Sequence, residues 1–166
     1  MKNILILILF FSFNQAISQE KVELKDLYYE NYVAHKISDG KLFTGIAQKT
    51  RNNGHIIYDE VYENGILIKS TVYYNRTENP IPARVILYYE KSFTPKTEIN
   101  YGLSKPRIEY IHYNQNGKKI LNEIFTDDKL TYKCEYENGK KHGTEYCVND
   151  DGTELTIEYN NGKKIK

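Results

Sequence analysis

The C-terminal third of the chain contains one pattern written twice, and this repeat limits the possible folds more than any other feature. Residues 125–142 align with residues 148–165 after a shift of 23 positions. The alignment places Asp127-Asp128 on Asp150-Asp151 and Asn138-Gly139-Lys140-Lys141 on Asn161-Gly162-Lys163-Lys164. A fixed period of this length predicts one small structural unit that stacks on copies of itself.

Turn-forming residues extend this period through most of the chain. The markers on one predicted edge are Gly40, Gly65, Lys91, Gly117, Gly139 and Gly162, at intervals of 25, 26, 26, 22 and 23 residues. Turns for the opposite edge lie between them, at Asn53-Gly54, Asp127-Asp128 and Asp151-Gly152. An Asn-Gly pair between two β-prone runs is a strong hairpin signal, and no segment after residue 18 shows the apolar period of a helix.

These signals predict an all-β fold, a single-layer twisted antiparallel meander of about five stacked β-hairpins. The middle is less regular: Pro80 and Pro82 predict an irregular loop, and Pro95, Gly102 and Pro106 predict breaks in the next stretch. We expect the turn glycines to be structural, with positive φ at Asn138-Gly139 and Asn161-Gly162. The predicted structural turn glycines are Gly40, Gly54, Gly65, Gly117, Gly139, Gly152 and Gly162.

Residues 1–18 are predicted to be a secretory signal peptide. Lys2 precedes an apolar run at 4–13, and Ala16-Ile17-Ser18 is a small-x-small cleavage signal. A short membrane anchor or a buried N-terminal strand is the alternative. We therefore expect one domain, residues 19–166, exported to the periplasm or secreted.

The charge balance argues against nucleic-acid binding. Only Lys2 is lost with residues 1–18, which leaves 22 basic and 22 acidic residues. Proteins that bind a phosphate backbone usually carry a basic excess on one face.

The segment Tyr136–Gly143 reads Tyr-Glu-Asn-Gly-Lys-Lys-His-Gly and resembles the MORN repeat, a β-hairpin unit of about this length. Residues 42–65 resemble a variant of the repeat that is common in exported bacterial proteins and often labelled antitoxin-like. The middle repeats lack the His-Gly pair, and residues 113–117 carry one extra residue. The resemblance implies structural glycines and aromatics, no catalytic residue, and a role as an interaction platform.

The residues themselves indicate no catalytic, metal or cofactor site. The four histidines, His35, His55, His112 and His142, fall in different repeats without nearby ligand partners. The Asp pairs suit ordinary hairpin turns, with acid–base catalysis or calcium binding as the less favoured interpretation. We expect no enzyme activity and no cofactor.

The lysine pairs predict a charged edge. Asp pairs recur at the opposite edge, so a neutral molecule would present a basic and an acidic rim. Such a surface can steer a charged partner, and simple edge protection by charge is the alternative. The predicted basic rim comprises Lys118, Lys119, Lys140, Lys141, Lys163 and Lys164.

Cys134 and Cys147 are the only cysteines, and two registers place them differently. A hairpin symmetric about Lys140-Lys141 sets them directly opposite one another, close to disulfide range. Alternation of Tyr132, Cys134 and Tyr136 against Tyr146 and Val148 favours a register slipped by one, which turns the two thiols to opposite faces. Export into an oxidising compartment favours the disulfide.

The function predicted from these features is that of a non-enzymatic protein-binding module whose Tyr-rich sheet docks a protein partner. A specific version is an immunity or antitoxin-like protein. The alternative is an envelope component that binds lipid head groups or glycan through the lysine rim, although a membrane surface is not the favoured partner.

Overall fold

A computed structural model describes residues 19–75, 79–103 and 106–165 of the chain. The predicted signal peptide, residues 1–18, lies outside the described residues. Within the described ranges no α-helix forms, and the single helical turn is the 3₁₀ segment η1, Leu24–Asp26. No helix in these ranges is long and apolar enough to span a membrane.

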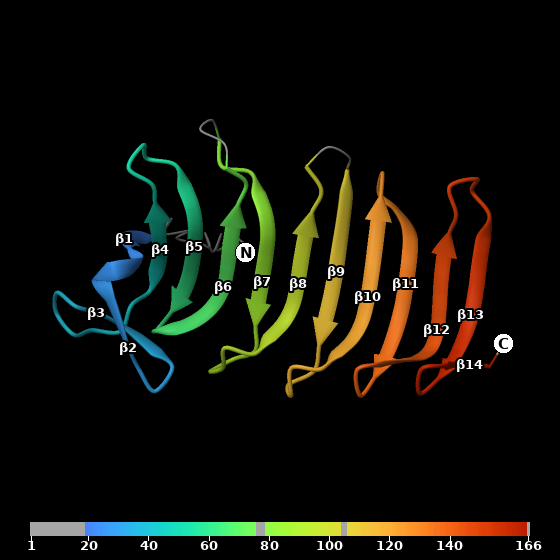
Figure 1. The fold of residues 1–166 in the computed structure, drawn as a ribbon. Coiled ribbons are helices and arrows are strands. Elements are labelled where there is room, and N and C mark those ends of the chain that lie inside the picture. The colour runs from blue at the N-terminus through green and yellow to red at the C-terminus, as the bar shows by residue number, and fades with distance from the viewer. Residues whose placement is uncertain (1–18, 76–78, 104–105, 166) are drawn as a thin grey trace, which may run out of the picture.

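Twelve strands form one open sheet, in the order β1-β4-β5-β6-β7-β8-β9-β10-β11-β12-β13-β14 (Figure 1). From β4 onward each strand pairs antiparallel with the next one in the chain. The strands of this sheet are β1 Glu20–Glu23, β4 Gly45–Thr50, β5 Ile56–Glu63, β6 Ile66–Tyr73, β7 Pro82–Tyr88, β8 Pro95–Tyr101, β9 Arg107–Tyr113, β10 Lys119–Thr126, β11 Lys129–Glu137, β12 Lys140–Val148, β13 Glu154–Asn160 and β14 Lys163–Lys164. The predicted all-β architecture of sequential hairpins is confirmed.

The connections alternate between two edges of the sheet. The edge at the bottom of Figure 1, here the glycine edge, holds the turns β5–β6, β7–β8, β9–β10, β11–β12 and β13–β14. The opposite edge, here the aspartate edge, holds the turns that begin with β4–β5 and end with β12–β13. Lys91 has φ +54 in the β7–β8 turn, so that turn forms without a glycine. Gly40, the first predicted marker, lies instead in the turn after β3 (Val33–Lys36).

The prolines interrupt the sheet less than the sequence predicts. Pro82 and Pro95 each begin a strand, opposite Tyr73 and Tyr88. The first position of a strand tolerates proline because its missing N–H need not join the ladder. A register shift beside each pairing absorbs the irregularity, so the predicted break at Pro95 is wrong and β8 runs without interruption.

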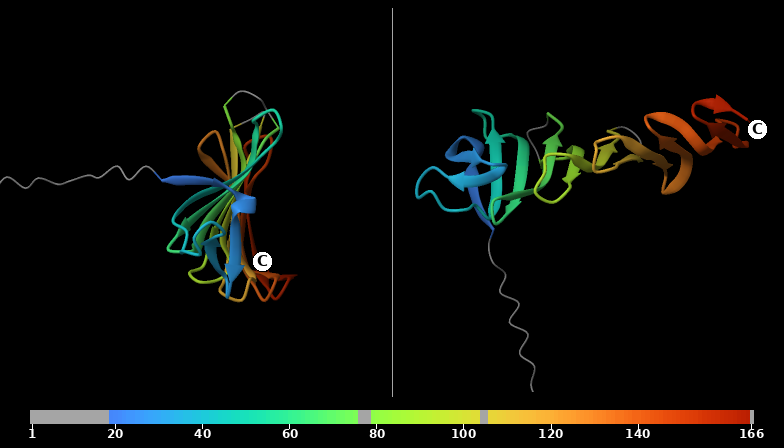
Figure 2. Two further views of the ribbon diagram at one scale, coloured as in Figure 1. Left: turned by 90° about the vertical axis from the view of Figure 1, so that its left-hand side faces the viewer. Right: turned by 90° about the horizontal axis from the view of Figure 1, so that it is seen from below.

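The N-terminal end is more than a single-layer meander. Strand β1 pairs parallel with β4, and β2 (Leu27–Glu30) pairs with β3 in a separate two-stranded sheet. This small sheet lies only at the N-terminal end of the large one (Figure 2). Its apolar residues Leu27 and Ala34 need a surface to bury them, which the first strands of the large sheet supply.

The compact core of the molecule sits in this N-terminal region. Its buried members are Leu27, Ala34, Phe43, Ala47, Tyr62 and Leu67, with Val22, Leu24 and Tyr88 packed against them. Backbone hydrogen bonds join the same parts: Ala34 N–H donates to Gly65 O at 2.8 Å, and Gly65 N–H donates to Phe43 O at 2.7 Å. The β5–β6 turn is thereby fixed to β3.

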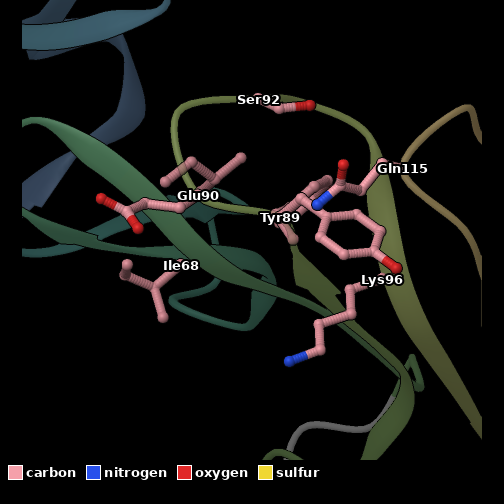
Figure 3. Close-up of a pocket in the computed structure, with 8 residues that line it drawn as sticks. Ile68, Tyr89, Glu90, Ser92, Lys96 and Gln115 are labelled. Carbon is pink, nitrogen blue, oxygen red and sulfur yellow. The ribbon is translucent and has the colours of Figure 1, made fainter.

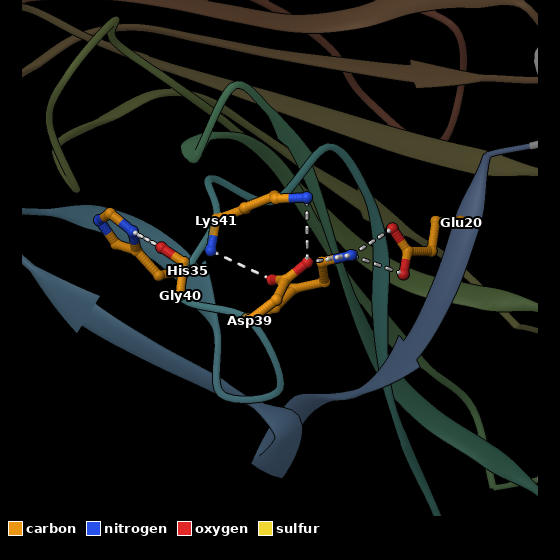
Figure 4. Close-up of polar contacts among 6 residues, drawn as sticks. Glu20, His35, Asp39, Gly40 and Lys41 are labelled. Carbon is orange, nitrogen blue, oxygen red and sulfur yellow. Dashed lines mark hydrogen bonds and ion pairs between the residues drawn. The ribbon is translucent and has the colours of Figure 1, made fainter.

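Polar contacts hold β1 against the β2–β3 sheet. Lys36 Nζ lies 3.3 Å from Glu20 Oε1 and 3.6 Å from Asp39 Oδ2. The Lys41 N–H also donates to Asp39 Oδ1 at 3.1 Å, which shapes the turn before β4 (Figure 4). The N-terminal segment is thus held by both apolar burial and ion pairing.

The two faces of the large sheet differ in what covers them. The register places Ala47, Tyr62 and Leu67 on one face, here the cap face, beneath the β2–β3 sheet. The other face, here the open face, carries Val85, Ile99, Tyr110 and Phe125, and no described element packs on it. Beyond about β7 no described element covers the cap face either, since the buried core ends there.

Candidate functional site

The seven glycines predicted to be structural all have positive φ, between +69° and +84°. An L-residue reaches this region at a cost of about 1–2 kcal/mol, whereas glycine enters it freely. Asn138 and Asn161, which precede two of them, have φ of +50° and +49°, the pattern of a two-residue hairpin turn with both central residues left-handed.

Gly143 is a further left-handed glycine that the turn pattern does not identify, with φ +80°. Cys134 pairs with Glu145 and Tyr136 with Lys141, so Glu135 of β11 stands opposite three residues of β12, His142 to Thr144. This bulge shifts the register of the hairpin. His142 and Gly143, the His-Gly pair on which the MORN resemblance partly rests, therefore form part of this bulge.

The β11–β12 turn is centred on Asn138-Gly139 rather than on Lys140-Lys141, and this keeps the two cysteines from facing each other. Cys147 lies opposite Tyr132 rather than opposite Cys134, so the thiols are a diagonal pair on the cap face. Diagonal neighbours lie about 7–8 Å apart, and their Cβ atoms, although somewhat closer, lie beyond the roughly 4 Å of a disulfide. Both cysteines are free. The observed register is neither the symmetric one nor the one slipped by one. The turn lies two residues before Lys140-Lys141, which alone would set Cys134 opposite Gly143, and the two extra residues of β12 bring Glu145 there instead.

A buried carboxylate occupies the place that symmetry would give to a cysteine. Glu145 is 7% exposed, and its Oε1 atom accepts hydrogen bonds from Lys141 Nζ and, at 3.0 Å, from Tyr132 Oη. Burial alone would raise the pKa of Glu145, but the hydrogen bonds from Lys141 and Tyr132 lower it below its usual value. The hydrogen bond to Glu145 raises the pKa of Lys141 in turn. This pair is fully engaged within the chain and is best explained as structural.

Lysine and tyrosine alternate across the last strands on the cap face. Tyr136 pairs with Lys141 and Tyr159 with Lys164 in the strand register. Lys119 Nζ lies 3.9 Å from the centre of the Tyr136 ring, and Lys141 Nζ lies 5.0 Å from that of Tyr159. A cation over an aromatic ring is attracted by the negative ring face. This Lys–Tyr ladder links successive hairpins through Lys119 and Lys141, each the second lysine of its pair.

The predicted basic and acidic rims lie on different edges, as the sheet topology requires. All six lysines of the predicted rim lie beside glycine-edge turns, and Lys118, Lys140, Lys163 and Lys164 are exposed. Asp127, Asp128, Asp150 and Asp151 lie in aspartate-edge turns and are exposed too. Since Lys119 and Lys141 pack on rings, four lysines rather than six present freely accessible charge.

The open face carries a patch of apolar and aromatic side chains across β8, β9 and β10. Tyr101, Ile108 and Phe125 form one cross-strand row. Ile99, Tyr110 and Glu123 form the next row, and Lys133 of β11 continues it. Directly opposed side chains on one face contact each other, so the rows form a continuous surface.

A hollow of about 380 Å³ lies on this patch, lined by Ile108, Tyr110, His112, Glu123, Phe125 and Asp128. The Tyr110 and Phe125 rings meet edge to face, with centroids 5.9 Å apart. A smaller hollow of about 190 Å³ shares Ile108, Phe125 and Asp128 with the first. Together the two hollows make one groove, here the Tyr110 groove, which reaches the aspartate edge at Asp128.

A hollow of about 630 Å³ lies at the glycine edge between the β7–β8 and β9–β10 turns. There the Tyr89 ring lies between the Gln115 amide and the Lys96 side chain (Figure 3). Its tyrosines already have partners, because Tyr89 Oη donates to Tyr113 O at 2.7 Å and Tyr88 Oη bonds to Ser70 Oγ at 2.9 Å. The tyrosine hydroxyls of this hollow therefore already join neighbouring hairpins.

Within the parts of the chain that the structure describes, no three His, Cys, Asp or Glu side chains gather as metal ligands would. The histidines lie in separate surroundings: His112 contacts Glu123 and Thr97, whereas His142 contacts Glu137. Sequence patterns did not identify the Tyr110 groove, because its residues come from strands whose register is set by the β9–β10 turn. Comparison of the chain with known protein families, curated proteins and solved structures gave no match.

Proposed function

We propose that this protein is a non-enzymatic binding module whose open face docks a protein partner. The observation that carries the proposal is the patch of Tyr101, Ile108, Tyr110 and Phe125 on the open face, over which no described element forms a second layer. Contiguous apolar surface on a soluble protein often marks an interaction site. Tyrosine and phenylalanine are also among the residues enriched at protein–protein interfaces.

The rigidity of the scaffold supports this role. Continuous pairing joins each hairpin to the next, and the Lys–Tyr ladder adds contacts between the strands from β10 to β13. A preformed surface loses little conformational freedom on binding, and this smaller entropic cost raises the affinity. The repeated hairpins act as a platform, in line with the resemblance to the MORN repeat.

Export and an immunity-like role belong to the same proposal. The motivation for export is the order of Lys2, the apolar run 4–13 and Ala16–Ser18. Mass spectrometry of protein recovered outside the cytoplasm tests it, with an N-terminus at Gln19 as the expected result. An intact Met1 in the cytosolic fraction would contradict export.

A second candidate function is binding of lipid head groups or glycan at the glycine edge. It is favoured by the four exposed lysines at that edge, Lys118, Lys140, Lys163 and Lys164. Edge lysines also protect a sheet against pairing with other chains. We therefore place it second.

The decisive experiment is capture from envelope extract with two matched variants. Tyr110 and Ile111 are neighbours on β9 whose side chains point to opposite faces. A single stoichiometric protein should bind the native chain and Ile111→Glu, and should be lost with Tyr110→Glu, with circular dichroism confirming that both variants fold. Equal capture by both variants would reject the open face, and recovery of lipid or glycan alone would favour the second function.

A further inference from the structure

We infer that the Tyr110 groove takes a basic side chain, lysine or arginine, from an apolar segment of the protein partner. The inference rests on the proposed function and deepens it by naming the chemistry of the partner. It is carried by the combination, in one groove, of aromatic rings, an aliphatic wall and two carboxylates.

The apolar walls come from two paired strands. Ile108 stands directly opposite Phe125, and Tyr110 stands opposite Glu123. Tyr110 also stacks with His112 at a centroid separation of 6.5 Å. These walls suit the aliphatic stem of a long basic side chain, which buries its methylene groups while its charged end stays near water.

Two carboxylates line the groove, and Arg107, which lines its smaller hollow, is paired with Glu109 at 4.0 Å. The carboxylates are those of Glu123 and Asp128, and Glu123 lies 3.5 Å from Lys133 Nζ and 3.8 Å from His112 Nε2. Among the described residues no ion pair involves Asp128. Asp128 is exposed, belongs to the aspartate edge and stands next to Asp127. An acidic side chain would be repelled there, whereas a cation gains an open carboxylate.

The rings add to this preference. Ammonium and guanidinium groups are attracted to the faces of Tyr and Phe rings. A guanidinium group can also stack on a ring and pair with a carboxylate through parallel hydrogen bonds. We therefore expect arginine to be preferred over lysine, and both over a neutral side chain of the same shape.

Three capped pentapeptides serve as probes in an NMR titration of the isotope-labelled protein. The first alternates leucine with arginine, the second replaces arginine with its uncharged isostere citrulline, and the third replaces it with glutamate. The arginine peptide should bind about fivefold more tightly than the citrulline peptide. The glutamate peptide should bind most weakly, and the largest amide shifts should fall on 108–112 and 123–128.

Two variants of one turn supply the matched control. Asp127 and Asp128 both have positive φ, +49° and +61°, a region that asparagine also adopts readily. Asp127→Asn and Asp128→Asn therefore remove the same charge from the same turn with little strain, but only Asp128 lines the groove. Asp128→Asn should weaken binding of the arginine peptide about fivefold, and Asp127→Asn less than twofold.

Several results would overturn the inference. They are equal affinity for the arginine and citrulline peptides, no binding of the arginine peptide at millimolar concentration, shifts centred away from the groove, or equal effects of the two Asp variants. The capture experiment separates these failures from failure of the proposed function. Capture lost with Tyr110→Glu but insensitive to excess arginine peptide keeps the docking face and rejects the basic side chain.

Discussion

Cys134 lies opposite Glu145 across the β11–β12 pairing, and this relationship keeps Cys134 away from Cys147. Cys134 is 1% exposed, whereas Cys147 is half-buried. We expect two free thiols per chain in denaturant without reductant. In the native protein a thiol reagent should modify Cys147 first and Cys134 only on unfolding. A titration that finds no thiol in denaturant would require a different register.

The turn glycines provide a matched pair for separating strain from steric clash. Gly65 and Gly139 have nearly equal φ, +77° and +79°. A Cβ at Gly139 would meet nothing within 4 Å, but one at Gly65 would lie 2.4 Å from Val33 Cγ1 and 2.9 Å from Ala34 O. Gly139→Ala should cost about 1 kcal/mol of unfolding free energy, and Gly65→Ala should cost clearly more. Denaturant titration of both variants measures the difference.

The same turn should respond to a bulkier substitution. Gly139→Val adds a β-branched side chain in the left-handed region, which is strained for such residues. It should lower the melting temperature more than Lys129→Ala, a change at an exposed position. Equal and negligible shifts would mean that the β11–β12 turn lies elsewhere.

Glu145 should make stability depend on acid pH. Its pKa is lower in the folded protein than the usual 4.5, despite burial, because Lys141 and Tyr132 donate hydrogen bonds to it. A depressed pKa stabilises the fold above the unfolded-state value, and this stability is lost as the pH falls through the folded value. Glu145→Gln should therefore cost about 2 kcal/mol at pH 7 and progressively less below about pH 4.

The control for this prediction is Glu137→Gln. Glu137 pairs with His142 at 3.3 Å, but its side chain is 56% exposed. An exposed pair contributes about 1 kcal/mol or less. The unfolding free energy of this variant should therefore follow that of the native protein between pH 7 and pH 3. If both Gln variants gave the same pH profile, Glu145 would not be the buried partner of Lys141.

The hydrogen bond between Tyr73 and Asp59 should make the fold less stable at alkaline pH. Tyr73 Oη donates to Asp59 Oδ2 at 2.5 Å, and Asp59 is 6% exposed. Burial, with the hydrogen bond to Asp59, raises the pKa of Tyr73 from 10.0 to about 12. A raised pKa means that this stability is present below pH 10 and is lost as the pH rises towards 12.

Removal of the Tyr73 hydroxyl tests the pair directly. Tyr73→Phe leaves a buried carboxylate oxygen without its partner, so it should cost about 1–3 kcal/mol at pH 7. It should also reduce the loss of stability between pH 10 and pH 12. Tyr32→Phe, at a side chain that is 65% exposed, should do neither.

The repeat period was sufficient to predict the hairpin series, because Asn-Gly pairs fix both the position of a turn and the order of strands. It could not predict the β11–β12 register, since Gly143 resembles the other glycines in sequence but sits inside a strand. The β2–β3 hairpin was also hard to place. Tyr32 has φ +66° at the position that glycine occupies in the β5–β6, β11–β12 and β13–β14 turns, and the centre of its ring lies 5.3 Å from that of Phe93. That contact joins residues 61 positions apart and leaves no local signal.

The Tyr110 groove shows a second limit of the sequence. Its apolar residues Ile108, Tyr110 and Phe125 alternate as in any half-buried strand, so their pattern predicts a face but not whether that face is covered. Only the placement of the β2–β3 sheet on the cap face leaves the open face bare. Coverage depends on contacts between distant segments, which periodicity does not encode.

The one-sided placement of the β2–β3 sheet also makes the cooperativity of unfolding uneven along the chain. Strands β4 to β6 are fixed by a buried core, whereas β12 to β14 are held mainly by their neighbours and by surface contacts. In such linear arrays the terminal units fray without melting the rest. Amide hydrogens should therefore exchange fastest near β14 and slowest near β5. Local stability should decrease along the sheet from the N-terminal core towards β14.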